Sequence, residues 1–270
     1  MKLYLKDGYQ LARKQSFAIG VMFLFHFIWS MLFYQFIQKH VVSVMQRFPP
    51  QQLATERVDL FLNESALLLF ETKLAQPFLW TLLIFVLARV VISPFITAGV
   101  YDSLHTEGPR GTIFIHGMKR LSGSFTLLFW LRNLLTAIPL YWLIPYAADR
   151  ILYADSYFSL VLAIVPILLG MMVYSSFLKL IFTYIQLAKT TDSRLYLALV
   201  VSFRHLLPIC GLALIVFSIT TLFGLLMFTS SLYWAGFLTL ILYLVYPLLQ
   251  MALKVWGISV QYKYWLEKKL

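Results

Sequence analysis

The chain has 270 residues, of which 61% are hydrophobic and only 12% are charged, and its mean hydropathy is +0.80. Soluble domains carry about 25% charged residues, so this composition excludes a water-soluble domain and predicts a membrane protein. The formal net charge of +11 indicates either basic loops beside a membrane or an anionic partner. The one cysteine, Cys210, excludes an intramolecular disulfide and a metal cluster held by cysteines.

Six apolar runs are long enough to cross a bilayer as helices, because a hydrocarbon core of ~30 Å needs about 20 apolar residues. In chain order they cover residues 15–38, 78–101, 121–148, 157–187, 206–229 and 232–256. The first run exceeds the apolar part of a secretory signal and ends without a small-residue cleavage site, so we expect it to be retained. The predicted fold class is all-α, with six transmembrane helices in a single membrane domain over residues 1–270.

Short amphipathic segments that end in or near a basic residue precede each odd-numbered span. They cover residues 8–14, 112–120 and 194–205. A basic amphipathic helix typically lies in the plane of the membrane interface, and we expect that placement for all three. The six spans then form three helical hairpins, each introduced by an interfacial helix.

A weak internal repeat supports the hairpins. The second and fourth spans end in the similar stretches Ala98-Gly99-Val100-Tyr101-Asp102-Ser103 and Ala188-Lys189-Thr190-Thr191-Asp192-Ser193. Arg120 follows the first aspartate by 18 residues, and Arg204 follows the second by 12. Repeats of this kind indicate a structural unit used more than once.

The distribution of charge predicts the orientation. With the amino terminus in the cytoplasm, residues 1–14, 102–120, 188–205 and 254–270 fall on that side. They carry 13 Lys and Arg against 5 acids when Lys254 is left out and assigned to its span. The outer segments, 39–77 and 149–156, carry 5 basic residues against 6 acids. The positive-inside rule therefore places both termini in the cytoplasm of a bacterial inner membrane, and no nucleic acid is needed to explain the basic charge.

The outer segment over residues 39–77 is the only sizeable hydrophilic region between spans. After the break at Phe48-Pro49-Pro50, apolar residues recur at roughly helical spacing. This pattern predicts a helix lying on the outer leaflet, and a lid for a partner or substrate is the alternative.

Basic residues inside the apolar runs are the main functional signal. They are Arg89, Arg132, Lys179 and Lys254, and the central part of each span contains no acid. A charge at the bilayer centre costs at least ~2.5–3.5 kcal/mol, so such residues usually face a cavity, a partner or a headgroup. We expect these four to bind an anion or a lipid headgroup; the alternative is that each snorkels to the interface alone.

A second set of basic residues lies at the predicted cytoplasmic boundary. These interfacial residues are Lys14, Lys119, Arg120 and Arg204. Bases at this position attract the anionic lipids of the inner leaflet.

The sequence contains no motif that specifies a reaction. No histidine pair has the spacing of a helical zinc site, and neither a nucleophile elbow nor a phosphate-binding loop occurs. Asp102 fits a helix-terminus residue better than a catalytic acid. We therefore assign no catalytic residue, metal or cofactor, and leave an enzyme with His105 or His116 as base as the least favoured alternative.

The arrangement of spans and basic segments resembles the membrane domain attached to some glycerophosphoryl diester phosphodiesterases, and related bacterial membrane proteins. The resemblance rests on Asp192-Ser193-Arg194, Ala198 and Ser202-Phe203-Arg204 before a span, with Gly117-Met118-Lys119-Arg120 as the parallel segment. It extends over residues 1–270. No segment here fits the soluble phosphodiesterase barrel, so the resemblance implies a membrane module, without hydrolytic activity, near lipid or phosphate metabolism.

These observations predict a non-enzymatic membrane protein that binds anionic lipid or an integral membrane protein partner, as a scaffold or subunit. The alternative is a small transporter or permease subunit for an amphipathic or phosphorylated substrate, with Arg89 and Arg132 meeting the anion. An interior without acids argues against proton coupling, which usually passes through Asp, Glu or His.

Overall fold

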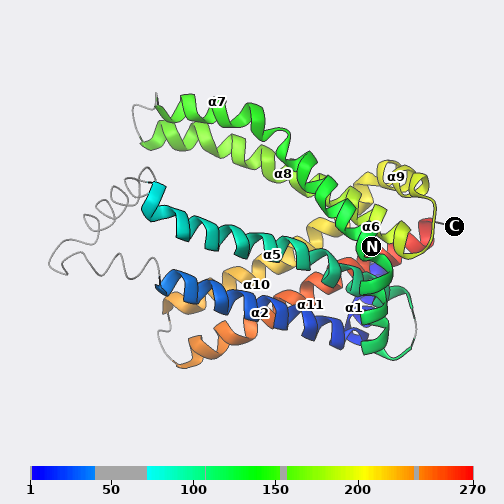
Figure 1. The fold of residues 1–270 in the computed structure, drawn as a ribbon. Helices are drawn as coiled ribbons and strands as arrows, with labels where there is room; N and C mark the ends of the chain where they lie inside the picture. Colours follow the sequence, from blue (N-terminus) through cyan, green and yellow to red (C-terminus); the bar gives the residue numbers. More distant parts are fainter. Residues whose placement is uncertain (1, 40–71, 107, 153–156, 234–236, 270) are drawn as a thin grey trace. The chain divides into compact units, whose positions relative to one another are not determined.

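The computed structural model describes residues 2–39, 72–106, 108–152, 157–233 and 237–269 (Figure 1). Every regular element within these ranges is helical, which confirms the all-α class. The helices are α1 (Lys2–Lys14), α2 (Ser16–Ile37), α5 (Thr72–His105), α6 (Arg110–Ala137), α7 (Leu140–Leu152), α8 (Tyr157–Thr190), α9 (Leu195–Arg204), α10 (Leu206–Tyr233) and α11 (Phe237–Lys268).

Within the described residues, five segments are long and apolar enough to cross a membrane. They are Ser16–Ile37, Trp80–His105, Gly111–Ala147, Ile164–Thr190 and Leu206–Ser230. The chain therefore has the helices of a multi-pass membrane protein. The predicted sixth span, residues 232–256, is not among the five; most of it belongs to α11, and its residues 234–236 lie outside the described chain. Residues 40–71 of the outer segment also lie outside it, so neither interpretation of that segment is tested.

The third predicted span is two helices instead of one. α6 ends at Ala137 and α7 begins at Leu140, because Pro139 has no backbone N–H and its ring excludes a helical hydrogen bond to the carbonyl of Leu135. That carbonyl instead accepts a hydrogen bond of 2.9 Å from the hydroxyl of Tyr174 on α8. The break in α6 thus provides a polar contact that ties it to α8.

Two of the three predicted interfacial helices are separate elements. α1 and α9 each end before the next helix begins, and Pro208 lies in the first turn of α10, where its missing N–H costs nothing. The prediction for residues 112–120 is wrong, because α6 runs without interruption from Arg110 to Ala137. α6 contains no proline, so nothing in this stretch stops the helix.

The chain divides into two compact units. The smaller unit, Val21–Ser93, includes most of α2 and the first part of α5, which contact one another through Trp29 and Phe85 with ring centroids 4.3 Å apart. The larger unit, Met1–Gly20 with Pro94–Leu270, holds all the other helices.

The core of the larger unit is concentrated at one end of its helices. Trp265, Tyr184 and Leu212 are its largest fully buried side chains, with Phe125 and Leu187, and side chains of α1 and α9 pack against this cluster. Residues further along α8 are exposed instead, as Leu168 and Val173 show at 62% and 70% exposure. An apolar exposed surface of this kind is suited to lipid. The buried end is where the polar side chains gather.

Candidate functional site

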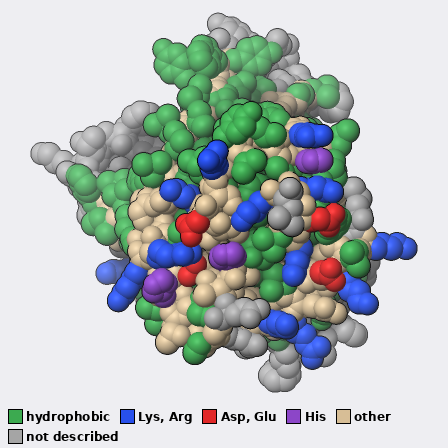
Figure 2. Space-filling view, turned by 90° about the vertical axis from the view of Figure 1, so that its right-hand side faces the viewer, with side chains coloured by type: hydrophobic (Ala, Val, Ile, Leu, Met, Phe, Trp, Pro, Cys, Tyr) green, Lys and Arg blue, Asp and Glu red, His purple; other side chains and the backbone are tan. Residues whose placement is uncertain are grey.

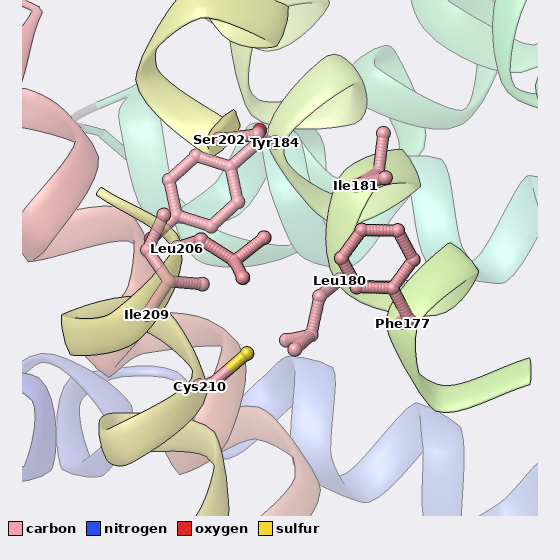
Figure 3. A pocket seen from close by; sticks show the side chains of 8 residues that line it. All are labelled: Phe177, Leu180, Ile181, Tyr184, Ser202, Leu206, Ile209 and Cys210. Atoms are coloured by element: carbon pink, nitrogen blue, oxygen red, sulfur yellow. The ribbon is translucent and has the colours of Figure 1, made fainter. Parts of the chain in front are cut away.

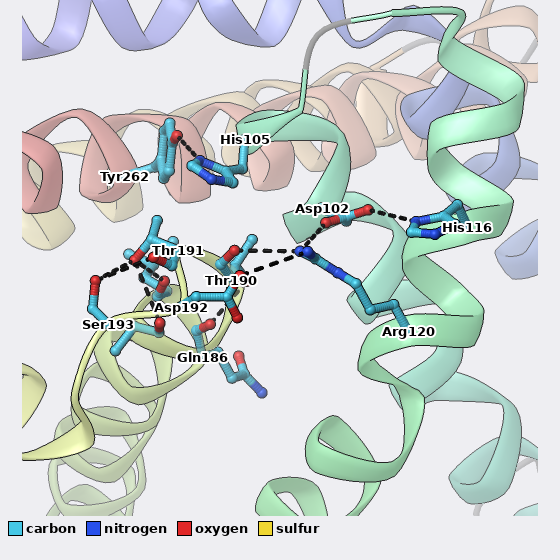
Figure 4. Close-up of polar contacts among 12 residues, drawn as sticks. Asp102, His105, His116, Arg120, Gln186, Thr190, Thr191, Asp192, Ser193 and Tyr262 are labelled. Carbon is cyan, nitrogen blue, oxygen red and sulfur yellow. Dashed lines mark hydrogen bonds and ion pairs between the residues drawn. The ribbon is translucent and has the colours of Figure 1, made fainter.

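An ion pair with a buried carboxylate lies at this end of the larger unit. Asp102 on α5 is 1% exposed, and its Oδ1 lies 2.7 Å from Nη2 of Arg120 on α6 (Figure 4). The two helices approach closely at Gly117, where a Cβ atom would collide with that of Asp102 and lie 2.8 Å from its Oδ2. Asp102 was expected to mark a helix end, and its carboxylate instead joins α5 to α6.

Arg120 also reaches the end of α8. Its Nη1 lies 3.7 Å from Oδ2 of the exposed Asp192, and its Nη2 donates a hydrogen bond of 3.4 Å to the carbonyl of Thr190. Asp192 has a φ of +48° and closes α8 in a Schellman motif, in which the Ser193 N–H donates to the Ala188 carbonyl at 2.8 Å. The guanidinium of Arg120, from within α6, therefore joins the carboxyl ends of α5 and α8.

The internal repeat places a basic residue after each aspartate, and in the structure both aspartates lie beside Arg120. Arg204 is exposed at the end of α9, and no ion pair to it occurs among the described residues. Arg204 follows Asp192 by six fewer residues than Arg120 follows Asp102, and it lies at the end of the separate helix α9.

Two histidines lie beside this ion pair. His116 is 72% exposed, with Nδ1 3.9 Å from Oδ2 of Asp102, and Nδ1 of His105 is 3.0 Å from the hydroxyl of Tyr262 (Figure 4). A histidine beside a carboxylate is the arrangement that a general base needs. The nearby hydroxyl of Ser103, however, donates to the Val100 carbonyl of its own helix. The geometry therefore offers His116 no positioned nucleophile in the described chain.

Basic side chains gather on the face of the larger unit that carries α1, α9 and the carboxyl end of α11 (Figure 2). The exposed members are Lys2, Lys6, Arg13, Lys14, Lys119, Arg120, Lys189, Arg194, Arg204 and Lys268. All four predicted interfacial residues are among them. Among the described acids of this face, only Asp192 and Glu267 are exposed. Such a surface favours contact with anionic headgroups.

The structure brings two of the four intramembrane bases together. The contacts Arg120–Thr190 and Leu135–Tyr174 fix an antiparallel register between α6 and α8, which places Arg132 level with Lys179. The two are close enough for their charges to interact. We call them the cation pair. No carboxylate pairs with either of them within the described chain.

The surroundings of the cation pair are apolar or neutral. The Arg132 guanidinium lies 5.2 Å from the ring centroid of Phe129, and its Nη2 donates to Oδ1 of Asn133 at 3.4 Å. Leu128, Leu178 and Phe182 form a buried cluster between the two helices, whereas Arg132 is half-buried and Lys179 is exposed. Charged side chains within an apolar span usually face a cavity, a partner or a lipid headgroup.

The other two predicted bases are placed elsewhere. Arg89 is exposed on α5 within the smaller unit, and Lys254 is exposed on α11 in the larger one. Sequence reasoning missed two neighbours of the cation pair. Tyr101 lies close enough to Arg132 to interact with its charge, and Thr183 makes a side-chain hydrogen bond with Tyr101. The signal for Thr183 is its position four residues after Lys179, on the same face of α8.

A small pocket lies between α8, α9 and α10 (Figure 3). It encloses about 210 Å³ with its open side included. Its lining residues are Phe177, Leu180, Ile181, Tyr184, Ser202, Leu206, Ile209 and Cys210. The hydroxyl of Tyr184 donates to Gln261 at 2.6 Å, and that of Ser202 donates to Ala198 at 2.7 Å. These polar groups are already engaged, so the pocket is an apolar recess and offers an anion nothing to bind.

α1 packs along the last part of α11. Gly8 allows this contact, since a Cβ there would lie 2.9 Å from the backbone nitrogen of Val260. Tyr4 packs edge-to-face on Tyr264 with ring centroids 5.3 Å apart. A side-chain hydrogen bond to the Glu267 carboxylate raises the pKa of Tyr4 to about 12 and lowers the pKa of Glu267.

The raised pKa predicts how α1 docking depends on pH. Above the ordinary value of 10.0 the undocked Tyr4 loses its proton while the docked one keeps it, so docking weakens as pH rises through about 12. We expect the phenolate absorbance of a Tyr4→Phe variant to lack one step near that pH. Glu267→Gln is the matched control and should return the step toward 10.0; an unchanged titration in both variants would contradict the contact.

The described residues contain no group of three or more His, Cys, Asp or Glu that could hold a metal ion. In comparisons with known proteins, the chain matches no family model, no curated protein and no solved structure.

Proposed function

We propose that the protein is a non-enzymatic, multi-pass protein of a bacterial inner membrane that binds an anionic lipid, with both termini in the cytoplasm. The observation that carries the proposal is the cation pair, in which Arg132 and Lys179 lie level on adjacent apolar helices. The basic face formed by α1, α9 and the end of α11 then lies against the anionic headgroups of the inner leaflet.

The position of Arg132 argues against independent snorkelling. It follows Arg120 by 12 residues on a continuous helix, which is about 18 Å along the axis. If Arg120 lies at the cytoplasmic boundary of the membrane, the distance from Arg120 to Arg132 exceeds half of a ~30 Å hydrocarbon core. An arginine side chain is much shorter than 18 Å. A phosphate that comes to the cation pair would neutralise both charges at once.

Removing the cation pair tests the proposal. In the Arg132→Gln, Lys179→Gln variant, we expect retained phospholipid to fall about tenfold or more, because the two charge-assisted contacts that hold the phosphate are lost. The measurement is native mass spectrometry of protein released from its own membrane in mild detergent.

The matched control for this experiment is Lys2→Gln, Lys6→Gln, which removes two exposed charges from α1. We expect it to keep the lipid. Equal lipid retention by the cation-pair variant and the wild type would contradict the proposal. A protein partner that stays bound in every variant, with no lipid, would favour the scaffold or subunit role instead.

A transporter or permease subunit for a phosphorylated or amphipathic substrate is the second candidate. The cation pair supports it in the same way, because an anionic substrate would meet the same two charges. A role as a membrane module close to phosphate-containing lipids agrees with the sequence resemblance to the phosphodiesterase membrane domain. Accumulation of substrate that depends on Arg132 would distinguish transport from lipid binding alone.

A further inference from the structure

Helix α9 has two apolar faces, and the protein covers only one of them. The helix packs against α8 and α10 at the end of the larger unit that holds the core (Figure 1). Its buried residues are Ala198, Val201 and Ser202. The opposite side carries Tyr196, Leu199 and Phe203, which are 73%, 39% and 61% exposed and recur at intervals of three and four residues. These three residues form the outer face of α9, which is apolar and exposed.

α1 is organised differently, although it too is a short basic helix. Its buried residues are Gly8 and Ala12, and it packs along α11. The side opposite these two residues carries Lys6, Gln10 and Arg13, which are exposed. The outward side of α1 is therefore polar and suited to water or headgroups, whereas the outer face of α9 is not.

The exposed apolar side chains of α9 continue into a membrane span. Leu207, in the first turn of α10, is 84% exposed, and Leu214 further along α10 is 62% exposed. Both belong to Leu206–Ser230, one of the five described segments that are long and apolar enough to cross a membrane. Because the surface of such a segment meets acyl chains, lipid lies next to the end of α9 that joins α10.

The charges around the outer face fit an anionic surface. Arg194 precedes the first turn of α9 and Arg204 lies in its last turn, and both are exposed. The helix itself contains no acid. A helix with an apolar face and basic residues at its edge lies in an anionic membrane interface, with the apolar face buried about 5–10 Å deep.

We propose that the outer face of α9 is inserted among the acyl chains of the leaflet beside it, while Arg194 and Arg204 bind the anionic headgroups of that leaflet. In this arrangement α1 stays packed on the protein and does not enter the bilayer. The inference rests on the proposed placement of the basic face against anionic lipid, and it adds which helix penetrates the membrane. It does not depend on the cation pair, which lies on α6 and α8.

Depth measurements test which helix enters the bilayer. Single cysteines at Tyr196→Cys and Phe203→Cys in a Cys210→Ser background are spin-labelled, and each full-length protein is reconstituted in vesicles that contain phosphatidylglycerol. Gln10→Cys on α1 is the matched control, and Leu168→Cys, at a position 62% exposed on α8, is the reference in lipid. We expect the ratio of collisions with oxygen to collisions with a water-soluble nickel complex to be about tenfold higher for both α9 labels than for the α1 label, because the complex is excluded from the acyl chains.

The lipid composition tests the role of the two arginines. In vesicles of phosphatidylcholine alone, the collision ratio at Phe203→Cys should fall about threefold or more, because no anionic headgroup attracts Arg194 and Arg204. Adding Arg194→Gln and Arg204→Gln should remove this difference between the two kinds of vesicle. Lys2→Gln with Lys6→Gln removes the same number of charges from α1 and should leave the difference in place. An equal ratio in both vesicles with the arginines intact would overturn anionic lipid as the partner.

The outcomes separate this inference from the proposed function. Labels on α9 that meet the nickel complex as often as the label at Gln10→Cys would overturn the insertion, even if native mass spectrometry finds a lipid lost with the cation pair. Spin–spin broadening between α9 labels of different molecules would show that a second copy of the chain covers the outer face, and would overturn lipid as its occupant. Inserted α9 labels in a protein whose cation pair retains no lipid would support the inference and count against the proposed function.

Discussion

Replacing Arg120 with glutamine is expected to destabilise the larger unit more than any other single charge removal. The change leaves the carboxylate of Asp102 buried at 1% exposure without its 2.7 Å partner. Breaking a buried ion pair costs about 3–5 kcal/mol, and the 37% exposure of Arg120 reduces this to roughly 2–3 kcal/mol. The midpoint of thermal unfolding in mild detergent should fall by roughly 5–10 °C.

Two further variants show whether the buried charge causes the loss. Asp192→Asn removes the exposed partner of Arg120, which is 81% exposed and 3.7 Å away, and should change the free energy of unfolding by less than about 1 kcal/mol. Asp102→Asn combined with Arg120→Gln removes both charges of the pair and should recover much of the lost stability. A double variant as unstable as the sum of its two single variants would exclude the coupling.

Replacing Gly117 with alanine is the second substitution with a large expected effect. The new Cβ would collide with the Cβ of Asp102 and lie 2.9 Å from its carboxyl carbon, so α5 and α6 must separate. Overpacking of this kind costs about 1–3 kcal/mol, and the shift would also lengthen the contact between Asp102 and Arg120. We expect a lower unfolding midpoint and faster protease cleavage in the α5–α6 connection.

Gly123→Ala on the same helix is the matched control. A Cβ at Gly123 meets nothing within 4 Å, so this change should be neutral or should stabilise α6 by about 0.5–1 kcal/mol. If both alanine variants behave alike, close approach of the helices at Gly117 is not what stabilises this end of the larger unit.

The sequence was sufficient for features that depend on hydropathy and local spacing. The runs over residues 15–38, 157–187 and 206–229 correspond to helices α2, α8 and α10 within a few residues, because a long apolar run in a membrane satisfies its backbone only as a helix. The separate short helices α1 and α9 were also predicted, and their place at a membrane interface stays a prediction. A helix break at Pro139 could be predicted from the proline itself. The apolar run over residues 121–148 was nevertheless interpreted as one helix, because its composition does not change at the break.

Features that depend on contacts between distant residues were not predictable. The spacing of 18 residues between Asp102 and Arg120 did not indicate an ion pair, because it depends on how α5 meets α6 at Gly117. The four intramembrane bases were recognised by type alone. That Arg132 lies beside Lys179 follows from the register of α6 against α8, which the Tyr174–Leu135 contact sets.

The packing of α1 on α11 has a consequence for the order in which the chain matures. The indole of Trp256 donates to the carbonyl of Leu5 at 3.1 Å, across a separation of 251 residues. Helix α1 therefore leaves the ribosome well before its partner surface on α11. Until α11 is made, α1 lacks the surface on which it packs, so its docking against α11 is a late step in the assembly of the larger unit.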